Sequence, residues 1–225
     1  MIKRSFKIFF ILILVLLIFN KKIISYYYTK KFSSWIEKPV KIDHINFKYS
    51  GFVEIDNIRI LDLNQNYYQN IFEAEKISFN FDVKSLISNV IIINNLDIKN
   101  PNFYLDIKIL KKKESIDNKK TIYQDNLGLA QKLNEKKPEK IWPKKDKDVN
   151  FLIKKAILSG TTANIKVSSI SDSTKINLSK MTFSNFGNEK GYQHYKDVLK
   201  IILFDIYGRT GNGKLKETLK KIYNF

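Results

Sequence analysis

The sequence contains no cysteine, which excludes disulfide bonds and thiolate metal sites. It has only two histidines, His44 and His194, and they show no metal-ligand spacing such as H-E-x-x-H. No serine lies in a G-x-S-x-G motif, and the acidic residues are scattered along the chain. No set of side chains therefore stands out as a nucleophile, a base and an oxyanion site. We expect a protein that is not an enzyme and that has no catalytic residues, no metal and no cofactor.

Arginine is the next scarce residue. Only three of the 40 basic residues in this chain of 225 are arginines: Arg4, Arg59 and Arg209. The net charge of +18 first suggests a nucleic-acid partner, but proteins that bind bases and phosphates favour arginine for its bidentate bonding. An excess of lysine, asparagine and isoleucine is also typical of an AT-rich genome. We therefore attribute much of the charge to coding bias and solubility, and expect no nucleic-acid partner.

The longest apolar run lies near the start of the chain, with basic residues on both sides. Because lysines at its ends can snorkel, residues 5–24 can cross a bilayer, and Tyr26, Tyr27 and Tyr28 would follow in the interfacial belt. No small residues follow the run, which favours an uncleaved signal anchor over a cleaved signal peptide. The early position and the basic start favour an inside N-terminus and an exported body. The predicted anchor residues are Phe6, Ile8, Phe9, Phe10, Ile11, Leu12, Ile13, Leu14, Val15, Leu16, Leu17, Ile18 and Phe19.

From residue 40 to residue 108 the dominant period is two, which predicts strands with one apolar and one polar face. The alternation slips by one near His44 and again within residues 52–61, which we interpret as bulges that help a sheet to curl. Ser50-Gly51 predicts a hairpin turn, and residues 83–89 predict one helical turn. Short connections between the strands predict an antiparallel, strongly twisted sheet. The candidate apolar face, either lipid-facing or core, consists of Phe47, Val53, Ile55, Ile77, Phe79, Phe81, Phe103, Leu105 and Ile107.

The middle of the chain has a different composition, rich in lysine and with two prolines, and only residues 126–133 resemble a helix. We interpret it as an exposed insertion or linker within a β-rich body. The expected divisions are an anchor and juxtamembrane segment (1–34), a first β-rich part (35–110), the lysine-rich insertion (111–148), a second β-rich part (149–190) and a C-terminal helical hairpin (191–225).

Within that hairpin, residues 208–214 match the G-x-x-x-x-G-K pattern of a phosphate-binding loop. Leu215 stands where magnesium binding needs a serine or threonine hydroxyl, and only a short helix follows. The preceding run, residues 192–207, is longer than an ordinary strand and predicts a buried helix. We therefore expect Gly208 to cap that helix and the loop to be a hinge; nucleotide binding remains a remote alternative.

The order of these pieces resembles the AsmA-like family of bacterial envelope proteins, of which this chain would be a short member. The similarity rests on the turn Ser85-Leu86-Ile87 followed by Leu96, Ile98, Pro101, Phe103 and Leu105. The later stretches "VNFLIKKAILSGTTANI" and "MTFSNFGNEKGY" extend it. It covers most of residues 35–225 except the lysine-rich insertion, and it includes no catalytic signature.

The resemblance implies a single-pass protein of the bacterial inner membrane, with a cytoplasmic N-terminus, a periplasmic body and a role in envelope lipid homeostasis or outer-membrane assembly. It implies a fold that is α+β but mainly β, with a transmembrane helix, a curled antiparallel sheet like a β-groove and two C-terminal helices. The implied partners are the membrane, phospholipid acyl chains and other envelope proteins. Two alternatives stay open: that the C-terminal helices fill the apolar face, and that the protein is a membrane-tethered protein–protein interaction module without lipid.

Overall fold

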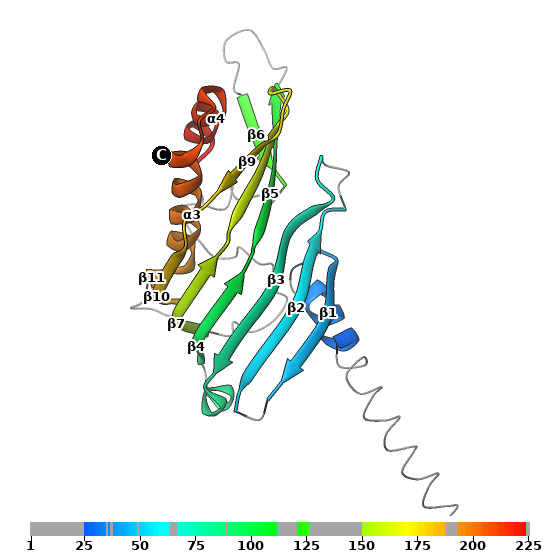
Figure 1. Ribbon diagram of the computed structural model, residues 1–225, viewed down its shortest axis with the longest axis vertical. Helices are drawn as coiled ribbons and strands as arrows, with labels where there is room; N and C mark the ends of the chain where they lie inside the picture. Colours follow the sequence, from blue (N-terminus) through cyan, green and yellow to red (C-terminus); the bar gives the residue numbers. More distant parts are fainter. Residues whose placement is uncertain are drawn as a thin grey trace, which may run out of the picture.

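The protein is described by a computed structural model that covers residues 25–34, 36, 38–48, 50–63, 67–88, 90–111, 121–126, 150–187 and 193–223. In these residues one sheet of 11 strands organises the fold, and two C-terminal helices lie along it (Figure 1). The predicted class, α+β but mainly β, is confirmed. The predicted anchor, residues 6–19, lies outside the described residues. No helix in the described part of the chain has both the length and the apolar character to span a bilayer.

The elements follow the alternation and turn signals of the sequence closely in the first half of the chain. The turn at Ser50-Gly51 is confirmed, with Gly51 at a φ of 79° that suits glycine. Residues 25–34 and 36 form an N-terminal helix. The remaining elements are β1 (Val40–Phe47), β2 (Phe52–Leu61), β3 (Asn70–Phe81), the 3₁₀ turn η1 (Val83–Ile87), β4 (Val90–Lys99), β5 (Asn102–Lys111), β6 (Thr121–Asp125), β7 (Asn150–Ser159), β8 (Thr162–Val167), β9 (Thr174–Asn177), β10 (Met181–Gly187), β11 (Gln193–His194), α3 (Tyr195–Arg209) and α4 (Gly213–Tyr223).

Two long strands, each bent in the middle, lie side by side at the centre of the sheet. β4 continues into β5 and β7 continues into β8, and the two bent strands run parallel (Figure 1). In every pair of the two ladders the partner lies sixty positions later, from Val90 with Asn150 to Ile107 with Val167. β3 pairs antiparallel with β4 and then with β5, while β10 and β9 pair antiparallel with β7 and β8. The ladder is therefore continuous across both bends.

The prediction of an antiparallel sheet was wrong in part, because β4–β7, β5–β8 and β10–β11 are parallel pairs. A parallel pair needs a long crossover connection. The lysine-rich segment between β5 and β7 is the part of the chain that makes this connection. It also contributes β6, which pairs with β5. Asn126 extends this pairing, because its side chain donates to the Tyr104 carbonyl and accepts from the Asp106 amide. The rest of the helix predicted at 126–133 lies outside the described residues.

A line of polar residues and glycine, which we call the crease, crosses the sheet at the bends. It consists of Asp43, Asn57, Glu75, Asn100 and Gly160, one on each successive strand, as the flanking pairs show. Asn57, Asn100 and Gly160 have φ values of 51°, 50° and 67°, a region that only glycine and asparagine enter readily. Here the apolar alternation shifts by one residue in every strand. The shifts of the alternation within β1 and within β2 were predicted to be bulges. That interpretation was wrong, because both strands shift together and their register is unchanged across it.

Helices cover the apolar side of the sheet near its two edges. Tyr28, Phe32 and Ile36 of the N-terminal helix pack against a cluster formed by β1, β2 and β3. A larger cluster unites β5, β7, β8, β9 and β10 with α3 and α4, and includes Leu215 and Leu219, which are almost fully buried. The core therefore has two parts, one under each set of helices.

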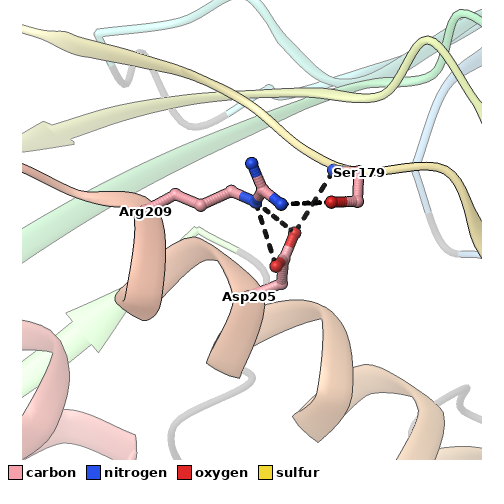
Figure 2. Close-up of polar contacts among 3 residues, drawn as sticks. All are labelled: Ser179, Asp205 and Arg209. Carbon is pink, nitrogen blue, oxygen red and sulfur yellow. Dashed lines mark hydrogen bonds and ion pairs between the residues drawn. The ribbon is translucent and has the colours of Figure 1, made fainter.

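The C-terminal hairpin differs slightly from its prediction. α3 begins at Tyr195, later than the expected start at residue 192, because Gln193 and His194 pair with β10 as β11. It also continues past the expected cap, so Gly208 lies within its last turn. Figure 2 shows why the last turn is stable: the Arg209 Nε atom lies 3.0 Å from both carboxylate oxygens of Asp205, and both residues bond to Ser179.

The crease gives a stability prediction. A Cβ atom on Gly160 would collide with the Asn100 side-chain oxygen, and alanine would have to adopt the left-handed φ of 67° that glycine has here. We expect Gly160→Ala to lower the free energy of unfolding by about 2 kcal/mol or more, because both strain and collision oppose it. The measurement is urea denaturation of the full chain followed by circular dichroism.

Gly208→Ala is the matched control, because a Cβ atom there meets no atom within 4 Å and the residue is helical. We expect this change to raise stability by about 0.5 kcal/mol. Equal effects of the two alanines would contradict the role given to Gly160.

Candidate functional site

All nine residues of the predicted apolar face point to the same side of the sheet. Cross-strand partners share a face, and Phe47 lies opposite Val53, which lies opposite Phe79. Ile55 lies opposite Ile77 in the same way. One apolar row runs across six strands through Phe47, Val53, Phe79, Leu96, Ala156 and Phe183. The alternation thus placed these side chains together although they come from strands far apart in the sequence.

Burial divides the nine residues into two groups. Four of them are 5% exposed or less and belong to the protein's own core: Val53, Ile55, Leu105 and Ile107. The others remain accessible to solvent: Ile77, Phe79, Phe81 and Phe103 are partly exposed, and Phe47 is 47% exposed although its ring lies 5.0 Å from that of Tyr28. A ligand that binds this face without unfolding the core must contact the second group.

The accessible residues concentrate where the two core clusters meet, on β3 and β4. We call this surface the central strip and define it as Ile77, Phe79, Phe81, Ile93, Leu96 and Ile98, all of them partly exposed. The β3 members pack against the cluster under the N-terminal helix, whereas Ile93 and Leu96 pack against the cluster under α3 and α4. Ile98 contacts both clusters. The C-terminal helices therefore bury Leu105 and Ile107, but the β3 part of the face belongs to another cluster.

The opposite face of the sheet holds an open cavity of about 510 Å³ along the crease. Its lining includes the carboxylates of Asp43, Glu73 and Glu75, the guanidinium of Arg59 and the amide of Asn100. Each carboxylate already has a partner within the protein: Arg59 lies 3.5 Å from Asp43, and Asn100 donates to Glu75 at 2.5 Å. In the described parts of the chain, no group of three or more His, Cys, Asp or Glu side chains is arranged to hold a metal ion.

Glu73 has the most connected position in this cavity. It accepts hydrogen bonds from the Tyr104 hydroxyl, at 2.8 Å, and from the Asn70 amide. Burial, together with the hydrogen bond and the charge of Glu73, raises the pKa of Tyr104 to about 12. The network holds β3 to β5 at the crease, so the charges of this cavity stabilise the bend of the sheet.

The loop that matches a phosphate-binding pattern joins two helices, as expected. α3 precedes it, so the strand that such a nucleotide site requires is missing. Asn212 caps α4: its side chain accepts from the Leu215 amide at 3.1 Å, and its carbonyl accepts from the Lys216 amide. The amides of Leu215 and Lys216 in the first turn of α4 thus have partners within the chain.

Sequence reasoning missed a buried polar contact between the lysine-rich segment and α4. Asp125 of β6 and Tyr223 of α4 are both buried, and the charge of the Asp125 carboxylate acts on the Tyr223 hydroxyl. Burial raises the pKa of Tyr223 well above its usual range, and the Asp125 carboxylate raises it further. The only sequence signal was the short alternating run before Asn126. The contact fixes one end of the crossover segment beneath the C-terminal helix.

Comparison of the chain with family models, with curated proteins and with solved structures finds no match. The candidate site therefore rests on the geometry of this chain alone. It is the central strip, since the carboxylates of the polar cavity are bonded internally.

The Glu73 network gives a pH-dependent prediction. Because the pKa of Tyr104 in the folded protein lies above the ordinary value of 10.0, its contribution to stability is complete below pH 10 and is lost as the pH rises towards about 12. We expect Glu73→Gln to lower the pKa of Tyr104 towards 10.0. NMR titration of the full chain with ring-labelled tyrosine measures it.

Glu54→Gln is the matched control, because Glu54 pairs with Lys76 and not with Tyr104. An unchanged Tyr104 titration in Glu73→Gln would show that Glu73 does not raise this pKa.

Proposed function

We propose that the protein is a membrane-anchored, non-enzymatic envelope protein whose central strip holds the acyl chain of a phospholipid. The observation that supports this proposal is the strip itself: six apolar side chains of β3 and β4 that remain partly exposed on one face, between two helix-covered clusters. Contiguous accessible apolar surface on a folded protein is typical of a binding site.

The chemistry of the strip favours an acyl chain over a polar ligand. All six members are aliphatic or aromatic, so they offer dispersion contacts and no hydrogen bonds. Each methylene group that such a surface removes from water contributes about 0.8 kcal/mol. A chain lying along several residues is therefore kept out of water, and these contacts replace those that it loses when it leaves a bilayer. The polar face of the sheet, where Lys76 of β3 pairs with Glu54 and Asp56 of β2, would not hold it.

The predicted anchor and the resemblance to the AsmA-like family support the same function. A signal anchor at residues 5–24 would place the described body next to the inner membrane on the periplasmic side. The N-terminal helix follows that segment directly and packs against the cluster that includes Phe79 and Phe81. The strip would then lie close to the bilayer from which a lipid is taken, in a role in lipid homeostasis or envelope assembly.

Photocrosslinking from the strip tests the lipid proposal. With p-benzoylphenylalanine in place of Phe79, we expect illumination of cells to attach a phospholipid covalently to the full chain, because the side chain would contact the acyl methylenes. Mass spectrometry of the purified protein detects the adduct.

Phe52 is the matched control position: it is also a partly exposed phenylalanine, but it lies opposite Asn80 on the polar face. Equal lipid adducts from positions 52 and 79, or none from position 79, would overturn the acyl-chain proposal. Protein adducts in place of lipid at position 79 would support a tethered protein-interaction module.

A fusion experiment tests the exported topology. We expect alkaline phosphatase joined after Phe225 to be active in a bacterial host, because the enzyme requires the oxidising periplasm. β-Galactosidase joined at the same residue serves as the reciprocal control, with activity expected only in the cytoplasm. Active galactosidase together with inactive phosphatase would show that the body is cytoplasmic.

A further inference from the structure

The outer side of α3 exposes large apolar side chains that take no part in the core. Ile201 is 45% exposed and Phe204 is 60% exposed. They lie on the side of the helix away from Ile202 and Ile206, which face the core. The Phe204 ring lies 6.1 Å from the half-buried ring of Tyr207. α3 therefore has an apolar inner side for the sheet and a second apolar surface on the outside.

Lysines of α4 border this surface. The Lys216 ammonium group lies 5.0 Å from the centre of the Tyr207 ring, and Lys220 follows one helical turn later. We call Ile201, Phe204, Tyr207, Lys216 and Lys220 the C-terminal patch. An apolar centre with a lysine border is the composition of helices that lie in the interface of a membrane with anionic lipids.

The two acidic side chains of α3, Asp197 and Asp205, leave the surface basic. Asp197 is exposed one turn before Ile201, and exposed Lys200 follows it. Asp205 is paired with Arg209 and accepts from the Ser179 amide at 3.4 Å, which directs its carboxylate towards the segment between β9 and β10 (Figure 2). The exposed residues of α4 add Lys214 and Lys221 against the single acidic Glu217. The outer surface of the hairpin is therefore basic as well as apolar.

The patch also lies far from the N-terminal helix. α3 and α4 lie near the edge of the sheet opposite to β1 and extend to the upper end of the molecule. The N-terminal helix lies in the lower half, beside β1 (Figure 1). A bilayer contact at the patch would therefore be a second contact, separate from the one made by the predicted anchor.

We propose that the C-terminal patch is a docking surface for a bilayer that contains anionic phospholipids. Phe204 and Ile201 enter the interface between headgroups and acyl chains, and Lys216 and Lys220 bind the negative surface. This interaction requires no lipid in the central strip, so either proposal can fail without the other.

The absence of cysteine makes a direct test simple. Gly208→Cys introduces a single labelling position one turn after Phe204, where a Cβ atom meets no neighbour within 4 Å. The labelled full chain, with an environment-sensitive NBD dye, is reconstituted in phosphatidylcholine nanodiscs. Vesicles of phosphatidylcholine, with or without phosphatidylglycerol as a quarter of the lipid, are then added. We expect a blue shift and stronger emission with the anionic vesicles only, weakened by salt.

Two pairs of variants in the labelled chain identify the residues responsible. Ile201→Ser with Phe204→Ser should abolish the response, and Lys216→Glu with Lys220→Glu should weaken vesicle binding about tenfold or more. The matched controls are Ile87→Ser, which removes an apolar side chain that is 94% exposed, and Lys154→Glu with Lys155→Glu on β7; both should respond normally. Circular dichroism confirms that each variant is folded.

Three results would overturn the proposal. They are no response to anionic vesicles, an equal response from the serine pair, and a blue shift that grows with protein concentration in the absence of vesicles. The last would assign the patch to a contact between copies of the chain.

Discussion

The parallel pairing of two bent strands, β4–β5 and β7–β8, is the constraint on which the rest of the structure depends. Because the offset of sixty residues is constant from Val90–Asn150 to Ile107–Val167, both strands bend at the same level. Asn100 and Gly160 occupy left-handed backbone regions next to each other, and hydrogen bonds close the ladder on both sides of the bend: the Asn100 amide donates to Ser159, and the Thr162 amide donates to Pro101. A bend in only one strand would break these bonds.

The shared bend explains why one side of the sheet is apolar across its full width. The alternation shifts in every strand at the crease, so rows on either side of it keep their apolar members on the same face. Ile45, Ile55, Ile77, Ile98 and Leu158 form one such row, and Val40, Ile60, Phe72, Phe103 and Ala163 form another beyond the crease. Helices from the two ends of the described chain cover the outer parts of this face, which leaves the central strip between them.

The local features of this fold were visible in the sequence, and the long-range pairing was not. Alternation identified the strands and their apolar members, because burial on one face imposes a period of two. It identified the shift near His44 but not its cause, since a single strand cannot show that its neighbour shifts at the same level.

The parallel pairing depends on a crossover through the lysine-rich segment, whose composition is that of an exposed linker. The Asp125–Tyr223 contact was hidden for the same reason: its two members lie on elements that only the tertiary fold brings together. Of the candidate site, the sequence identified the β3 side chains and their face. It did not assign Ile93, Leu96 and Ile98 of β4 to that face, and it did not show which residues the helices bury.

The central strip and the C-terminal patch differ in chemistry in a way that suits two different forms of lipid. The strip has no charged member, and it lies on the sheet face against which the helices pack. An acyl chain already separated from its bilayer gains there from apolar contact alone.

The patch has lysines beside exposed Phe204 and lies on the outer side of α3. That combination gains most where headgroup charge and acyl methylenes occur together, which is at the surface of an intact bilayer. The patch lies on the outer side of α3, whereas the strip lies on β3 and β4, so the two surfaces are separate parts of the molecule. If both proposals hold, the two surfaces fit successive contacts with lipid, first as a membrane and then as a single molecule, or in the reverse order.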